Sequence, residues 1–224
     1  MLKLRRDRMS QHGKTLAILA FGVAIAVSGL ALTRQVLAVA AEADAERLHN
    51  AILDYVALKN PSAPLKAFRE FPAVLVAEAR RSSIDHCLAL AQAEVESEFR
   101  HDAVGAAGEI GLFQILPTTA ALFEDQVGRF RRPSLVNGRR DLGDLADPVV
   151  STRFAMAYLR DIMTRKPNLR EALTEYNGGP AGRHPHYYRA VMGAYVEILE
   201  HPELRCRFRE TPRPLPLLTF LMRA

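Results

Sequence analysis

The stretch over residues 92–120 constrains the fold more than any other, because an apolar helical pattern meets an acidic residue there and gives way to a loop of small residues. Apolar side chains recur at the spacing of one helix face at Leu88, Ala91, Val95 and Phe99. Glu96 lies on the adjoining face, at the border between that stripe and solvent. Glycines at 105, 108 and 111 permit tight turns, so we expect the loop to fold back opposite the carboxyl group.

The position of Glu96 makes it a candidate general acid. Burial beside an apolar core disfavours the charged form of a carboxyl group and raises its pKa, as a proton donor working near neutral pH requires. A glutamate near a helix end is more often a solvated surface charge. The interpretation of Glu96 therefore depends on the residues around it.

The order of residues around Glu96 resembles that of the soluble-lytic-transglycosylase family of lysozyme-like peptidoglycan enzymes. The matching residues are Glu96-Ser97, Phe99, Ala103-Val104, Ala107-Gly108, Gly111-Leu112-Phe113-Gln114, Pro117 and Thr119-Ala120. Further along, Glu175-Tyr176-Asn177-Gly178-Gly179-Pro180 is similar to the family's Ala-Tyr-Asn-Ala-Gly-Pro, and Tyr187 begins a stretch similar to its Tyr-Val-x-x-Val. The motifs keep their order over residues 72–199, which is more specific than any one of them alone.

The resemblance implies a mainly α, lysozyme-like domain of the goose-type lysozyme and lytic transglycosylase class over residues 72–200. Its cleft would lie between the Glu96 helix and the Tyr176 region. The implied activity is cleavage of the β-1,4 bond between N-acetylmuramic acid and N-acetylglucosamine, with formation of 1,6-anhydromuramoyl ends. Glu96 would be the single general acid and base. Asp102 and Glu109 stand where the family carries neutral residues, so we expect both to be solvated rather than catalytic.

The resemblance also implies the substrate-binding residues. They are Ser97, Gly111, Phe113, Gln114, Tyr176, Asn177 and Tyr187. Ser97 would hold a sugar or the carboxylate, Tyr176 would orient the acid, and Phe113 would join the tyrosines in stacking on sugar faces. The sequence departs from the family at Gly105, where serine is usual, and at Ser151, where asparagine is usual.

The amino terminus predicts a membrane segment. Residues 1–14 form a basic tail, and residues 15–33 carry no charged side chain. An uncharged run of this length favours a retained signal anchor, although Ala38-Val39-Ala40 leaves a cleaved signal peptide as the alternative. By the positive-inside rule the tail stays in the cytoplasm. We therefore expect a single-pass protein of the bacterial inner membrane with its catalytic domain on the periplasmic side.

Two further segments flank the expected domain. Residues 34–71 read as a helical connector, and residues 201–224 as a tail that packs back onto the domain or docks to a partner. Within the domain, the basic stretch between Gln126 and Asp144 is expected to be a solvated loop or a contact for anionic parts of the cell wall.

The charge distribution and the cysteines indicate which partners and cofactors to expect. The net charge is +5, but residues 1–14 account for most of it, so the rest of the chain gives no reason to expect nucleic acid. No Cys/His set has the spacing of metal ligands, and no cofactor is expected. Cys87 and Cys206 are expected to be buried free thiols, with a disulfide between them as the alternative.

The expected partners are therefore peptidoglycan glycan strands and the inner membrane. Two other functions stay open. One is a muramidase that hydrolyses the same bond with water. The other is an inactive wall-binding module of a secretion, conjugation or flagellar assembly.

Overall fold

A computed structural model describes residues 33–182 and 185–207 of the chain. The chain divides into two compact units, Met1–Arg47 and Leu48–Ala224. In the first unit, residues 33–47 are helical and mostly exposed. The predicted basic tail, the predicted anchor except Thr33, and residues 208–224 of the predicted tail lie outside the described residues. Within the described ranges, no helix combines the length and apolar character needed to cross a bilayer.

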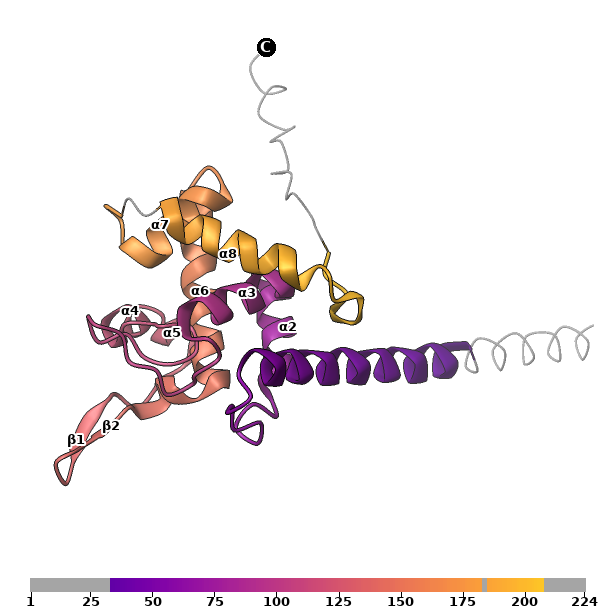
Figure 1. Cartoon of the computed structure of the whole chain (residues 1–224), viewed down its shortest axis with the longest axis horizontal. Coiled ribbons are helices and arrows are strands. Elements are labelled where there is room, and N and C mark those ends of the chain that lie inside the picture. The colour runs from indigo at the N-terminus through magenta and orange to yellow at the C-terminus, as the bar shows by residue number, and fades with distance from the viewer. Residues whose placement is uncertain (1–32, 183–184, 208–224) are drawn as a thin grey trace, which may run out of the picture. The chain divides into compact units, whose positions relative to one another are not determined.

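The second unit is mainly helical, which confirms the predicted class (Figure 1). After helical residues 48–59 come α2 (Phe71–Arg81), α3 (His86–Ser97), α4 (Pro117–Ala121), α5 (Glu124–Val127), α6 (Pro148–Arg165), α7 (Leu169–Gly178) and α8 (Pro185–Ile198). Short 3-10 turns, η1 (Gly143–Ala146) and η2 (Pro202–Leu204), lie before α6 and after α8.

Aspartates fix where the two central helices begin. Asp85 accepts a hydrogen bond from the Cys87 backbone N–H at 3.1 Å, as expected of an N-cap, and starts α3. Asp147 does the same for Val149 at 2.7 Å, with Pro148 as the first residue of α6. The α3 helix ends earlier than expected, because residues 98 and 99 adopt left-handed backbone angles.

The α3 helix lies at the centre of the unit. It packs against α8 and α2, while α6 packs against α2 and α7. Residues Ala89, Leu90, Ala91 and Ala93 of α3 have no exposed surface. A helix that is buried on all sides over this stretch belongs in a core. The carboxyl-terminal end of α3 therefore delivers Glu96 from the core to the surface.

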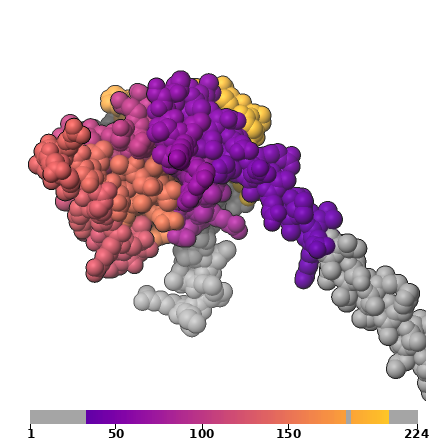
Figure 2. Space-filling view, turned by 90° about the horizontal axis from the view of Figure 1, so that it is seen from below, coloured from indigo at the N-terminus to yellow at the C-terminus, as the bar shows by residue number. Residues whose placement is uncertain are grey.

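Residues 48–59 fasten the last turn of α3. Ile52, Tyr55 and Val56 are buried. Figure 2 shows purple residues from the early part of the chain in contact with magenta and orange residues of later elements. The Tyr55 hydroxyl donates to Glu94 Oε2 at 2.7 Å, and Lys59 Nζ lies 2.9 Å from Glu94 Oε1. Glu94 therefore ties α3 to this segment.

The basic stretch before α6 contains a hairpin, so the expectation of a loop was wrong for these residues. Strand β1 (Ser134–Val136) pairs antiparallel with β2 (Arg139–Asp141), and the hairpin extends away from the helices in Figure 1. Asn137 and Gly138 between the strands have positive φ angles of 52° and 75°. These are the angles of a tight two-residue hairpin turn, for which Asn-Gly is the strongest sequence signal.

A disulfide joins Cys87 in the first turn of α3 to Cys206 beyond η2, with the Cα atoms 5.5 Å apart. The prediction of free thiols was therefore wrong for both cysteines of the chain, each of which the structure describes. Residues 201–207 fold back onto the start of α3, where Arg207 N–H donates to Asp85 Oδ2 at 2.9 Å. A contact between residues 119 positions apart leaves no local pattern in the sequence.

We predict that removing this disulfide destabilises the domain. A cross-link closing so long a loop restricts the unfolded chain, so a Cys87→Ala/Cys206→Ala variant should lose about 3–5 kcal/mol of unfolding free energy. Urea unfolding followed by circular dichroism measures the loss, and treatment with a reductant should lower the wild-type midpoint similarly. An unchanged midpoint, or free thiols titrated in the native protein, would contradict the disulfide.

Candidate active site

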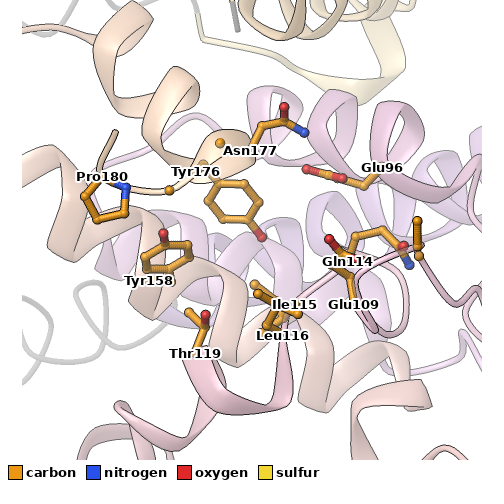
Figure 3. Close-up of a pocket in the computed structure, with 14 residues that line it drawn as sticks. Glu96, Glu109, Gln114, Ile115, Leu116, Thr119, Tyr158, Tyr176, Asn177 and Pro180 are labelled. Atoms are coloured by element: carbon orange, nitrogen blue, oxygen red, sulfur yellow. The ribbon is translucent and has the colours of Figure 1, made fainter. Parts of the chain in front are cut away.

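A pocket of about 650 Å³ opens where the end of α3, the loop after it, and helices α6 and α7 meet. Figure 3 shows Glu96, Glu109 and Gln114 on one side of this pocket, and Tyr158, Thr119 and Pro180 on the other. Asn177 and Tyr176 also line it, so two motifs separated by about half the domain contribute to one hollow. The pocket corresponds to the cleft expected between the Glu96 helix and the Tyr176 region.

Glu96 is half-buried at the end of α3. Its Oε1 accepts a hydrogen bond from the Tyr187 hydroxyl of α8 at 2.5 Å. Loss of hydration raises the pKa of the Glu96 carboxyl group to about 7, although the Tyr187 hydrogen bond opposes the rise. Burial also raises the pKa of Tyr187, so its hydroxyl keeps its proton and acts as the donor. A carboxyl group with a pKa near neutrality can both give and take a proton.

The loop after α3 folds back on itself, as the glycines predicted. Isolated bridges pair Val104 with Ile110 and Ile110 with Ile115. The Gly111 N–H donates to Ala103 O at 2.9 Å, closing the base of the loop. Gly111 has a positive φ of 82°, and a Cβ atom there would collide with the carbonyl oxygen of Leu145 in η1. The glycine is therefore required by packing against the protein's own backbone.

Gln114 presents one end of its amide to the pocket. Its Nε2 donates to Gly111 O at 2.8 Å and to Ala103 O at 3.2 Å, so the amide nitrogen is bound to the loop. The amide oxygen takes part in no hydrogen bond within the described residues. It can therefore accept an N–H from a ligand, such as the N–H of an N-acetyl group.

Tyrosines of α6 and α7 form the aromatic wall. The rings of Tyr158 and Tyr176 lie 5.2 Å apart, and both line the pocket. The Tyr176 hydroxyl donates to Phe113 O at 3.0 Å, which ties α7 to the loop. We expected Tyr176 to orient the acid, but the hydroxyl that is hydrogen-bonded to Glu96 belongs to Tyr187. Tyr187 had been assigned to the substrate, and it is almost fully buried beneath the acid.

Besides Tyr187, three predicted substrate-binding residues do not line the pocket, so their assignments need correction. Ser97 is only 2% exposed, and its hydroxyl hydrogen-bonds Leu112 O at 2.9 Å, which joins α3 to the loop. Phe113 has no exposed surface and packs in the core, where no sugar can stack on it. Gly111 faces Leu145, as described above. These positions build the cleft and do not line it.

Sequence reasoning also missed residues that shape the site. Glu109, expected to be solvated, lines the pocket together with Glu96. Tyr158, which the sequence did not mark as a site residue, forms part of the wall. Ser151, buried on α6, accepts a hydrogen bond from the Phe113 N–H at 3.3 Å and so fastens the loop from below. The departure from the family at Ser151 was the one sequence signal that marked its position.

One cluster of potential metal ligands exists within the described part of the chain, at the start of α3. Its members, Asp85, His86 and Cys87, place their ligand atoms within 4.8 Å of one another. The Cys87 sulfur is bonded to Cys206, and Asp85 accepts hydrogen bonds from Tyr195 and Arg207. The cluster therefore serves the packing of the carboxyl-terminal segment, and we assign it no metal.

Comparison with known proteins gives a family match over most of the domain. Residues 74–189, more than half of the chain, match the family model described as the transglycosylase SLT domain. No curated protein matches the chain.

Several solved structures are similar to it, among them two lytic transglycosylases. One is an inactive mutant of the lytic transglycosylase Slt from Pseudomonas aeruginosa, with 24% identity and a TM-score of 0.46, covering 63% of this chain and 27% of that one. The other is the 70 kDa soluble lytic transglycosylase from Escherichia coli, with 24% identity and a TM-score of 0.41, covering 62% and 23%. The chain thus spans about a quarter of the length of these structures.

We predict that ionisation of Glu96 lowers the unfolding free energy of the domain. Its pKa is about 7 in the folded protein against 4.5 for the ordinary group, so the folded state binds more protons between these values. The unfolding free energy should therefore fall as pH rises through this window. Glu96→Gln should be more stable than wild type by about 1–3 kcal/mol at pH 8, and equal to it below about pH 4.5.

The measurement is chemical unfolding of both proteins from pH 4 to pH 8. Glu98→Gln, which neutralises an exposed glutamate two residues further on, is the matched control. A difference that stays constant over this range, or that Glu98→Gln reproduces, would contradict the assignment.

Proposed function

The chain belongs to the transglycosylase SLT domain family, and from this premise we propose that it is a lytic transglycosylase that cuts the glycan strands of peptidoglycan. Glu96 is the general acid in this proposal. The observation that carries it is a half-buried carboxyl group with a pKa of about 7 that lines a pocket between two family motifs. A group with this pKa is protonated in a substantial fraction of molecules near neutral pH, as a proton donor must be.

The first step breaks the bond between N-acetylmuramic acid and N-acetylglucosamine. Glu96 gives its proton to the oxygen between the sugars, and the electron pair of the broken carbon–oxygen bond goes to that oxygen. The 2-acetamido group of the muramoyl sugar stabilises the electron-poor carbon. The Tyr187 hydroxyl then stabilises the carboxylate of Glu96 through the hydrogen bond at 2.5 Å, because a donor favours the charged form.

The second step closes the muramoyl ring. The carboxylate of Glu96 takes a proton from the 6-hydroxyl, whose oxygen bonds to the electron-poor carbon and forms the 1,6-anhydro sugar. Glu96 regains its proton and water is not consumed. The pKa of about 7 serves both steps, because the same group must give a proton and then accept one.

Around the acid, three residues of the proposed site line the pocket. We assign Gln114 to accept an N–H from an N-acetyl group, and Tyr176 and Asn177 to contact the sugars. Tyr187 positions the Glu96 carboxyl group and does not contact the sugars in this proposal.

The proposed location is the bacterial inner membrane, with the domain in the periplasm. The uncharged residues 15–33 after a basic tail support a membrane anchor. The Cys87–Cys206 disulfide supports an oxidising compartment, because such bonds persist in the periplasm and are rare in the cytosol.

Glu96→Gln is predicted to abolish cleavage while keeping the fold. Loss of a general acid lowers the rate by about 100- to 10,000-fold, and glutamine keeps an oxygen that can accept the Tyr187 hydrogen bond. The assay incubates both proteins with purified peptidoglycan and identifies the product ends by mass spectrometry. Wild type should release anhydromuramoyl ends. Reducing ends would show hydrolysis in place of transglycosylation, and binding without any cleavage would contradict an enzymatic function.

The anchor is predicted to be retained in the mature protein. When the full chain is expressed in a bacterium with an inner and an outer membrane, it should fractionate with the inner membrane and keep its original amino terminus. Amino-terminal sequencing of the membrane fraction tests this. A chain that begins at Ala41, after Ala38-Val39-Ala40, would instead identify a cleaved signal peptide.

A further inference from the structure

Glu109 is a carboxylate in the pocket that the proposed mechanism leaves without a role. It lines the same hollow as Glu96 and is half-buried (Figure 3). Its Oε2 accepts a hydrogen bond from the Ala107 N–H at 2.9 Å, which holds the carboxylate against its own loop. Glu98 and Asp102, the other acidic residues between α3 and α4, are exposed and do not line the pocket. The loop therefore places one particular acid at the site.

Gly105 provides the room that Glu109 occupies. A Cβ atom at this position would collide with Glu109 Oε2 and lie only 2.8 Å from Gln114 Oε1. No positive φ requires a glycine there. The absence of a side chain at Gly105 therefore leaves space for the Glu109 carboxylate. Any larger residue at this position, including the serine usual in the family, would have to displace Glu109 or Gln114.

The charge of Glu109 acts on the acid of the site. Glu96 is faced by Tyr187 from α8, Tyr176 from α7 and Glu109 from the loop. After desolvation, the negative charge of Glu109 is a further cause that raises the pKa of Glu96. The two carboxylates are therefore close enough to interact, and a sugar bound beside Glu96 lies within the field of both.

We propose that Glu109 is a second catalytic carboxylate, which stabilises the positive charge that develops on the muramoyl carbon and its 2-acetamido group as the glycosidic bond breaks. The inference rests on the proposed function. No bond to Glu109 forms, and Glu109 gives up no proton. The electron pair of the broken bond goes to the oxygen that receives the proton of Glu96. A fixed negative group beside a carbon that becomes positive lowers the barrier, because the attraction is stronger in the transition state than in the ground state.

The test compares Glu109→Gln with wild type on soluble glycan chains prepared from peptidoglycan. Glutamine keeps an oxygen for the Ala107 N–H, so the loop is retained while the charge is lost. We expect kcat to fall about 10- to 100-fold with little change in KM. The basic limb of the pH profile of kcat/KM should move to lower pH, because Glu96 loses the neighbour that raises its pKa. Asp102→Asn, the matched loss of charge in the same loop, should leave both unchanged.

A second variant tests the role of Gly105. Gly105→Ser should displace the carboxylate and lower kcat in the wild-type background, but add little in the Glu109→Gln background. Equal losses in both backgrounds would show that Gly105 acts independently of Glu109 and would overturn the inference. So would a Glu109→Gln enzyme with the kcat and pH profile of Asp102→Asn. In either case wild type still releases anhydromuramoyl ends, so the proposed function survives. A wild type that releases none refutes both.

Discussion

The carboxyl group of Glu96 is partly shielded from water by helices that come from distant parts of the domain, and the chemistry of the site depends on that burial. Helix α3 carries the group out of the core, and α8 covers it with Tyr187. Desolvation raises the pKa of the group, and the tyrosine hydrogen bond limits the rise. The balance leaves a proton that can be given and recovered near neutral pH.

Much of the remaining structure holds α3 and its loop in register. Tyr55 and Lys59 bind Glu94 near one end of the helix, and the disulfide of Cys87 binds the other end to the segment after η2. The loop is fastened separately, by Ser97 to α3 and by Tyr176 to α7. The hydrogen bonds among these contacts satisfy polar groups that would destabilise the fold if they were left without partners. The contacts that hold the cleft in shape therefore also stabilise the domain.

The correct predictions from the sequence came from local patterns and from the resemblance to a known family. The glycines predicted the folded loop, and the resemblance to the family predicted the shared pocket of Glu96, Gln114 and Tyr176. Ser97 and Phe113 are direct neighbours of pocket residues, yet their side chains point into the protein. A sequence motif gives the order of the residues but does not show in which direction each side chain points. The disulfide, and the pocket wall opposite Glu109, depend on contacts between residues far apart in the chain, which one sequence alone does not reveal.

The most direct test of this account is the titration of Glu96 itself. Carbon NMR of protein labelled at glutamate side-chain carboxyl groups, with the Glu96→Gln spectrum used to assign the signal, measures the pKa of this one group. The account predicts a midpoint of about 7 in the folded protein. A midpoint near 4.5, the ordinary value for glutamate, would mean that the carboxyl group is solvated and would contradict the central claim.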